Sequence, residues 1–214
     1  MVVRWIETLR GFNSNIYLID SDRPYLVDTG CGADTPHVIE QISDYLRGRP
    51  LQAILLTHCH ADHAGGAAEV SKAFKCPVFL GARDIPAFES GDISATFADG
   101  IGVELRPVKC RPLHEGDVFD AGECRLRVIE TPGHTPGSVC FYDELSHALF
   151  SGDTVFAQGF GRTDLPGGSM DEMRQSLGIL RNFEIEHLYP GHGAEASDGN
   201  KAVEAAVMMT EGWY

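Results

Sequence analysis

The segment Thr57–His63 constrains this chain more than any other part of its sequence. It reads Thr-His-Cys-His-Ala-Asp-His, so three imidazoles and one carboxylate lie within six consecutive residues. The apolar run 53–56 precedes it and the helix-like run 64–74 follows it, which places these donors at a strand-to-helix junction. Nitrogen and oxygen donors gathered in this way suit a divalent transition metal. A merely polar loop is disfavoured, because four donors without partners would be desolvated without compensation.

The spacing within this segment indicates more than one ion. His58 and His60 are two residues apart, so they can point the same way in extended backbone. Asp62 and His63 fall in the first turn of the following helix and are expected to face the same hollow. Because four ligands are too many for one metal that must also hold a substrate, we expect two adjacent ions. Cys59 lies between ligands and is expected to be a buried free thiol rather than a fifth ligand.

Further donors follow apolar runs downstream, each within a turn rich in glycine or proline. They are His134 in Thr131–Gly137, Asp153 in Ser151–Thr154 and His192 in Pro190–Gly193. Each alone is weak evidence, because a His or Asp after a strand is often a turn residue with local hydrogen bonds. Together they are strong evidence, because Gly and Pro fix the backbone and let it approach closely. The complete candidate set is His58, His60, Asp62, His63, His134, Asp153 and His192.

These motifs closely resemble those of the metallo-β-lactamase-fold hydrolases, and within them the glyoxalase II (hydroxyacylglutathione hydrolase) and persulfide dioxygenase branch. The matching segments are 27–30, 58–63, 131–137, 151–153, 161–164 and 190–193. The resemblance implies an α/β fold, a four-layer αββα sandwich in which the metal loops line one edge between two sheets. Strand-like and helix-like runs that alternate along the chain agree with this fold class.

The resemblance also assigns the donors to two ions. One ion would be held by His58, His60 and His134. The other would be held by Asp62, His63 and His192, and Asp153 would bridge the two. Zn²⁺ is the favoured ion, and Fe or Mn would also accept these ligands. True β-lactamases of this fold usually place Cys or another residue where Asp153 stands, and diiron oxygen reductases place Glu where His60 stands, so both fit less well.

The expected reaction is hydrolysis of a small 2-hydroxyacyl thioester, as in glyoxalase II. Metal binding lowers the pKa of water towards about 7, so a metal-bound hydroxide would be the nucleophile. Asp62 is expected to orient that nucleophile while it binds metal. A thiolate leaving group needs little protonation, so a site without an evident general acid suits a thioester better than an amide.

Two alternatives use the same residues. A single Fe(II) held by His58, His134 and Asp153, or by His60 in place of His58, would be a two-His-one-carboxylate site suited to O₂ chemistry on a persulfide. A non-catalytic metal-binding sensor is the other, and the complete ligand set argues against it. The sequence does not identify the thiol part of the substrate. Glyoxalase II enzymes usually have an added C-terminal helical domain that contacts glutathione. Only about twenty residues follow His192 here.

Composition supports one compact domain, residues 1–214, that acts on a small molecule. The chain has 214 residues and is 43% hydrophobic, enough for one core. Its net charge of −14 would repel phosphate backbones, so nucleic acid is not an expected partner. No apolar run is long enough to cross a membrane, and Met1–Arg4 enters a strand-like segment, so a cytoplasmic location is the default expectation. The six scattered cysteines are expected to be free thiols.

The pattern of apolar residues predicts the order of elements. Strands are expected at 2–9, 14–19, 24–29, 51–57, 77–81, 104–109, 124–130, 139–143 and 147–151. Helices are expected at 34–47, 63–74, 170–182 and 198–209. Residues 82–112 contain small, polar and Pro-interrupted stretches and are expected to form a substrate-side insertion.

Some polar and aromatic residues have expected roles outside the ligand set. Asp28 is expected to fix loop amides near the site. Arg162 and Asp164 are expected either to pair and brace a Gly-rich loop or to contact substrate. Trp213 and Tyr214 are typical of a tail that packs on its own core or on a partner subunit, so a homo-oligomer stays open. The other histidines, interpreted as structural or exposed, are His37, His114, His147 and His187.

Overall fold

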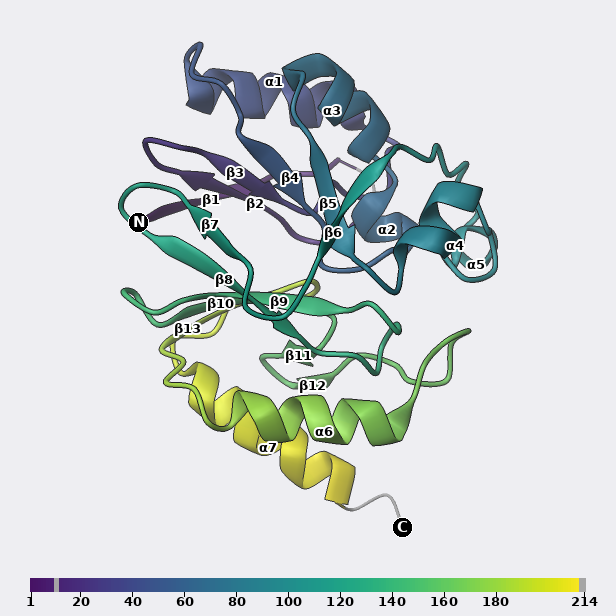
Figure 1. The fold of residues 1–214 in the computed structure, drawn as a ribbon, viewed down its shortest axis with the longest axis vertical. Coiled ribbons are helices and arrows are strands. Elements are labelled where there is room, and N and C mark those ends of the chain that lie inside the picture. Colours follow the sequence, from purple (N-terminus) through teal and green to yellow (C-terminus); the bar gives the residue numbers. More distant parts are fainter. Residues whose placement is uncertain (10–11, 212–214) are drawn as a thin grey trace.

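The protein is a four-layer αββα sandwich (Figure 1). The structure, a computed structural model, describes residues 1–9 and 12–211. Two sheets face each other, with α1 (Thr35–Leu46) and α3 (Ala67–Phe74) over one and α6 (Met170–Leu180) and α7 (Gly199–Glu211) over the other. This confirms the predicted fold class. Trp213 and Tyr214 lie outside the described residues.

The first sheet has six strands and becomes parallel toward its second half. In spatial order its strands are β1 (Val2–Ile6), β2 (Ile16–Asp20), β3 (Tyr25–Val27), β4 (Ala53–Leu55), β5 (Val78–Gly81) and β6 (Cys110–Leu113). The pairs from β1 to β3 are antiparallel, and the pairs from β3 to β6 are parallel. The β3–β6 strands therefore all end at the same edge of the sheet.

The second sheet has five strands, mostly antiparallel. In spatial order they are β13 (His187–Pro190), β10 (Ala148–Gly152), β9 (Val139–Asp143), β8 (Arg125–Glu130) and β7 (Val118–Asp120). The β10–β13 pair is parallel, so Asp153 and His192 leave their strands at the same edge. A short hairpin of β11 (Val155–Phe156) and β12 (Gly159–Phe160) follows β10.

Alternating side chains explain why each sheet is buried on both faces. On β2, Ile16 and Leu18 pack toward α1 and α3, whereas Tyr17 and Ile19 pack toward the second sheet. The same alternation occurs on β9, where Val139 and Phe141 face the first sheet and Cys140 and Tyr142 face α6 and α7. Successive side chains of a strand point to opposite faces, so two apolar faces require a layer on each side.

The region predicted as one helix over 63–74 forms two helices. α2 (Ala61–Ala64) ends before Gly65 and Gly66, and α3 begins at Ala67. A Cβ on Gly65 would lie 2.5 Å from the carbonyl oxygen of Cys31, and one on Gly66 would lie 2.6 Å from that of Thr29. The loop after β3 therefore packs directly on this backbone, and only glycine leaves room for it.

The predicted strand at 104–109 is wrong, because the strand begins at Cys110. β6 pairs with β5 only over Cys110–Leu113, and Pro107 lacks the amide hydrogen that a longer ladder would need. Pro112 is tolerated within β6 because β6 is an edge strand. Residues 110–112, the end of the predicted insertion, thus belong to the sheet edge. The rest of that segment includes α4 (Ile85–Ser90) and α5 (Ala98–Ile101).

Two further sequence-based expectations concern the cysteines and the membrane. All six cysteines are free, as predicted, and five of them are buried. Within residues 1–9 and 12–211, no helix is both long and apolar enough to span a bilayer.

Candidate metal centre

The seven predicted donors meet at one edge of the sandwich. His58 and His60 lie in the loop after β4, and His134 lies between β8 and β9. The remaining donors come from α2 and from the loops after β10 and β13. They form overlapping groups of nitrogen and oxygen atoms that lie within 4.8 Å of one another. The structure therefore brings the whole predicted set together.

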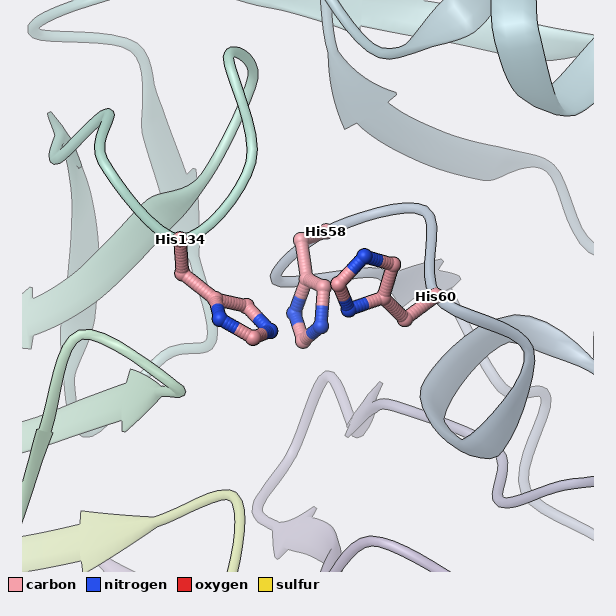
Figure 2. Close-up of side chains that lie close together, drawn as sticks. All are labelled: His58, His60 and His134. Carbon is pink, nitrogen blue, oxygen red and sulfur yellow. The ribbon is translucent and has the colours of Figure 1, made fainter. Parts of the chain in front are cut away.

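The first group consists of His58, His60 and His134. Figure 2 shows the three rings gathered together, His134 from one loop and His58 and His60 from another. Their ring centroids are 4.5–4.8 Å apart, and their planes cross at 79–85°. Three nearly perpendicular rings can aim their nitrogens at one point from three directions, which is the arrangement of a facial set of metal ligands.

The second group consists of Asp62, His63 and His192. The Nε2 atom of His192 lies 3.1 Å from Asp62 Oδ2 and 3.3 Å from His63 Nε2. Asp153 lies between the two groups: its Oδ1 is 3.2 Å from His63 Nε2, and its Oδ2 is 3.5 Å from His134 Nε2. One carboxylate thus faces both groups, as the bridging assignment requires.

Hydrogen bonds fix three of these histidines in the form that binds metal. His134 Nδ1 lies 2.7 Å from the backbone oxygen of Arg162, which can only accept, so Nδ1 carries the proton. His63 Nδ1 lies 2.7 Å from Asp28 Oδ2 and is a donor for the same reason. With Nδ1 committed to an outer partner, Nε2 is the nitrogen of each ring that is left to bind metal.

His58 is fixed through a relay. The Thr57 hydroxyl donates its proton to Asp28 Oδ2 at 2.9 Å, so it can only accept from His58 Nδ1, 3.1 Å away. The Nε2 atoms of His58, His60 and His134 are buried and have no hydrogen-bond partner among the described residues. Buried polar atoms without partners are costly, and a metal ion that accepts their lone pairs removes this cost. The donor set therefore fits a divalent metal.

The electrostatics of the site also favour a cation. Burial lowers the pKa of His60 to about 3, and burial with neighbouring histidines lowers that of His58, so both rings are neutral at pH 7. Burial acts to raise the pKa of Asp153, but His63, His134 and His192 outweigh it and hold this pKa well below its usual value. The site thus presents neutral imidazoles around an ionised carboxylate.

His63 differs from the other histidines. Burial acts to lower its pKa, but Asp153, Asp28 and Asp62 outweigh burial and raise the pKa well above its usual value. Without metal, His63 therefore keeps a proton on Nε2 as well as the one shared with Asp28. A cation bound among these carboxylates takes the place of that proton, so metal binding should release it.

The expected role of Asp28 in fixing a loop amide is confirmed, and Arg162 and Asp164 form the pair that was one of their two expected roles. Asp28 accepts from the backbone amide and the hydroxyl of Thr57 and orients His63. Arg162 forms a two-point ion pair with Asp164 through contacts of 2.9 Å, and both side chains are exposed. The backbone oxygen of Arg162, rather than its side chain, contacts the site.

Two residues near the site were missed by sequence reasoning. Asp84 is buried and bonds to the loops on either side of the first group. The sequence feature that could have pointed to Asp84 is its position shortly after β5, a parallel strand that ends at the same edge as the site. Phe97 lies 6.0 Å from the ring of His60 and has φ of 53°, the left-handed region, which is rare for a bulky side chain. No local pattern in the sequence predicts the contact between Phe97 and His60.

The remaining histidines lie outside the site. His114 and His187 are exposed, and His37 and His147 are half-buried. His147 has Glu184 and Glu186 nearby, on the exposed surface around the start of β13. A hollow of about 450 Å³ opens beside His192, and its other lining residues are Phe156, Ala157, Gln158, Gly193 and Ala194.

The chain belongs to the metallo-beta-lactamase superfamily, whose family model matches residues 9–192. It is 34% identical over 189 residues to "Probable metallo-hydrolase MJ0888" of Methanocaldococcus jannaschii, covering 86% of this chain and 89% of that protein. It is 31% identical to "Probable polyketide biosynthesis zinc-dependent hydrolase BaeB" of Bacillus velezensis, covering 93% of this chain and 82% of that protein.

Solved structures show the same likeness. The di-iron-bound form of TTHA1623 is 36% identical with a TM-score of 0.76, covering 92% of this chain and 96% of that one. The B3 metallo-beta-lactamase BLEG-1 is 28% identical with a TM-score of 0.79, covering 94% of this chain and 96% of that one. Metal-dependent hydrolysis is thus supported at the level of the superfamily, and divalent metal binding agrees with the geometry of the donors.

Proposed function

We propose that this protein is a metal-dependent hydrolase that cleaves a small 2-hydroxyacyl thioester, as glyoxalase II does. The observation that carries the proposal is the donor arrangement. A buried group of donors and a partly buried one lie side by side, with Asp153 facing both and with the hollow beside His192 open to a substrate. Such an arrangement holds metal and leaves access for a substrate.

The ligand assignment follows from the two groups. His58, His60 and His134 would hold one ion, and Asp62, His63 and His192 would hold the other. Asp153 would bridge them. When bound, such ions supply Lewis acidity and lower the pKa of a coordinated water. Zn²⁺ is our choice, and Fe is the main competitor, since one relative is named zinc-dependent and one similar structure is described as di-iron-bound.

Asp62 is the residue that we assign to the proton of the attacking water. Burial acts to raise its pKa, but His63 and His192 outweigh burial and lower it, so the carboxylate is ionised at neutral pH. Its Oδ2 is bonded to His192, and the side chain retains 17% exposure toward solvent. An ionised, partly open carboxylate can orient a water molecule and accept its proton.

The lining of the hollow favours a good leaving group. Apart from His192, the described residues that line it are Phe156, Ala157, Gln158, Gly193 and Ala194. None of these side chains can donate a proton as an acid, so a leaving group must depart without strong protonation. A thiolate does so, whereas an amine does not. This supports a thioester over an amide.

A persulfide dioxygenase with one Fe(II) is the second candidate, because one donor group has the composition it needs. His58, His63 and Asp153 form a compact two-His-one-carboxylate set. This set contains His63 in the place where the sequence predicts His134. A dioxygenase would consume O₂, whereas a hydrolase needs only water.

The test is to load metal-free protein with Zn²⁺ or Fe(II) and to offer a lactoyl thioester or a persulfide in an oxygen electrode. We expect thioester cleavage without O₂ uptake, and loss of cleavage after chelation. Persulfide-dependent O₂ uptake without thioester cleavage would replace the proposal with the second candidate. A β-lactam arm is included, and turnover of the β-lactam alone would refute both.

A further inference from the structure

We infer that Asp84 is a positioning residue for the metal centre, one that ties together the two loops that supply the imidazoles of Figure 2. The inference rests on metal binding by this site and not on the identity of the substrate. It therefore holds or fails separately from the thioester proposal.

The side chain of Asp84 makes its hydrogen bonds to these two loops. It is 1% exposed and accepts three hydrogen bonds. Oδ2 accepts from the backbone amide of Cys59 at 2.9 Å and from the hydroxyl of Thr135 at 2.7 Å, and Oδ1 accepts from the backbone amide of Gly137 at 2.6 Å. All three donors belong to the metal loops.

The carboxylate of Asp84 makes these contacts instead of a hydrogen bond that caps its own helix. Asp84 is the N-cap residue of α4, a position where an Asp side chain usually bonds to amides of its own helix. Here no side-chain cap hydrogen bond forms. The side chain instead reaches residues that are 25, 51 and 53 positions away in the sequence. Helix capping alone therefore does not account for Asp84.

The bonded positions connect Asp84 to the ligands. Cys59 lies between His58 and His60, and Thr135 directly follows His134. The loop of Cys59 follows β4 in the first sheet, whereas the loop of Thr135 lies between β8 and β9 in the second sheet. Asp84 thus joins the two sheets at the place where each contributes imidazoles to the first group.

The backbone around Asp84 is shaped for this contact. A Cβ on Gly137 would lie 2.5 Å from the backbone nitrogen of Asp84, and a Cβ on Gly81 would lie 1.9 Å from the carbonyl oxygen of Gly137. Both positions accept only glycine without a shift of the chain. The loop of His134 is therefore held directly against the end of β5.

The second donor group has its own support. Asp28 orients His63 and bonds to Thr57, whereas the hydrogen-bond partners of Asp84 are Cys59, Thr135 and Gly137, so the two carboxylates hold different residues. Loss of Asp84 should therefore weaken mainly the ion held by His58, His60 and His134. Partners of this kind typically change metal affinity by about 10- to 100-fold.

Asp84→Asn is the variant that tests the inference. Asn has nearly the same shape, but only one of its two ends accepts, so either the Cys59 amide or the Gly137 amide must face an NH₂ group. Asp143→Asn is the matched control. Asp143 is also fully buried and accepts three hydrogen bonds, from the amides of Arg125 and Ser146 and from the Ser146 hydroxyl, and none of these residues belongs to the metal loops.

The measurements are the melting temperature of each metal-free protein and its Zn²⁺ affinity by titration. We expect both variants to lose thermal stability, but only Asp84→Asn to bind one of its ions about 10- to 100-fold more weakly. Wild-type affinity in Asp84→Asn, or equal loss in both variants, would overturn the inference. If Asp84→Asn does not fold, Thr135→Val removes one donor and keeps the carboxylate. A smaller loss of affinity is then expected, and unchanged affinity would overturn the inference.

Discussion

His63, a metal-donor histidine, is held from behind by a short hydrogen bond to Asp28, as short as the one that holds His134 to the backbone oxygen of Arg162. His63 Nδ1 lies 2.7 Å from Asp28 Oδ2, and both side chains are buried. Asp28 is itself held by the amide and the hydroxyl of Thr57 and adopts φ of 60°. A non-glycine residue in this left-handed region is strained, which is typical of functional sites. Asp28 therefore orients a ring that the second ion would use.

Asp28→Asn should weaken the second ion selectively. Asn has one accepting end, so it cannot accept both from the Thr57 backbone amide, which bonds to Oδ1, and from His63, which bonds to Oδ2. Either orientation of the Asn side chain loses one of these bonds and loosens the support of the His63 ring. We expect about 10- to 100-fold weaker binding of one ion, with the other retained near one per chain. Elemental analysis after dialysis against limiting chelator measures this. Two tightly bound ions in the variant would contradict it.

Asp153→Ala should be the most damaging change of a carboxylate. It removes a group that faces both His63 and His134, at 3.2 and 3.5 Å, so both ions lose a ligand. Two cations would also face each other with less compensating charge. We expect metal content well below one per chain and turnover lower by more than about 100-fold, the upper end of what an outer partner costs.

His192→Ala is the comparison for Asp153→Ala. His192 belongs to one group only, so its loss should remove one ion and leave the first group filled. Equal metal content in the two variants would show that Asp153 does not bridge. Full wild-type content in His192→Ala would show that the chain holds a single ion.

His60 gives a pH dependence that can be measured on metal-free protein. The pKa of His60 is lowered to about 3, whereas an unfolded histidine titrates near about 6.5. Between these values the unfolded chain binds a proton that the folded chain does not. Acid therefore favours unfolding in this window, and the effect is absent above about pH 6.5.

His60→Gln should reduce that slope. For one proton, the free energy of unfolding changes by up to about 1.4 kcal/mol per pH unit, and the variant lacks this contribution. Denaturant unfolding between about pH 4 and 7 gives the difference between wild type and variant, in which the other titrating groups largely cancel. His63 has a pH dependence of the opposite sign. Because its pKa is raised in the folded protein, its contribution to the free energy of unfolding falls as the pH rises. Parallel curves for the two proteins would count against the lowered pKa.

The gathering of the donors was predictable because each one sits at the end of an apolar run. Parallel strands that share an edge place such residues together, as Asp153 and His192 do after β10 and β13. The close spacing of His58, His60 and Asp62 needs no long-range information. These local signals predict which donors gather, whereas the four-layer sandwich was implied by the resemblance to the metallo-β-lactamase-fold hydrolases.

The parts that were not predicted depend on contacts between distant residues. Asp84 reaches Cys59 and Thr135, which lie 25 and 51 positions away. Its position after β5 places it at the edge of the site, but the sequence does not show which residues it bonds to. The strands β7, β11 and β12 have only two or three residues, too few to show a period of two. The misplaced strand at 104–109 has the same origin, since its true limits are set by the length of β5.

Phe97 should affect substrate use more than metal binding. Its ring lies 6.0 Å from His60, and a Cβ on Gly100 would touch it, so the ring is held over the site from the predicted insertion. Phe97→Ala keeps every donor and every hydrogen bond that orients one. We expect a several-fold change in KM or in substrate preference with metal content unchanged. Loss of metal in parallel with activity would assign Phe97 to the support of the His60 loop instead.

The last prediction concerns the leaving group. The hollow beside His192 offers no acidic side chain among its described lining residues, so bond cleavage should depend on how well the leaving atom carries negative charge. For one 2-hydroxyacyl group, we expect kcat/KM to fall steeply from thioester to alkyl oxygen ester to amide. Among thioesters, a lower pKa of the thiol should give faster cleavage. Matched esters and amides assayed with one metal-loaded preparation measure this series. Equal rates for the thioester and the amide would show that the enzyme protonates its leaving group, and would remove the main support for a thioester substrate.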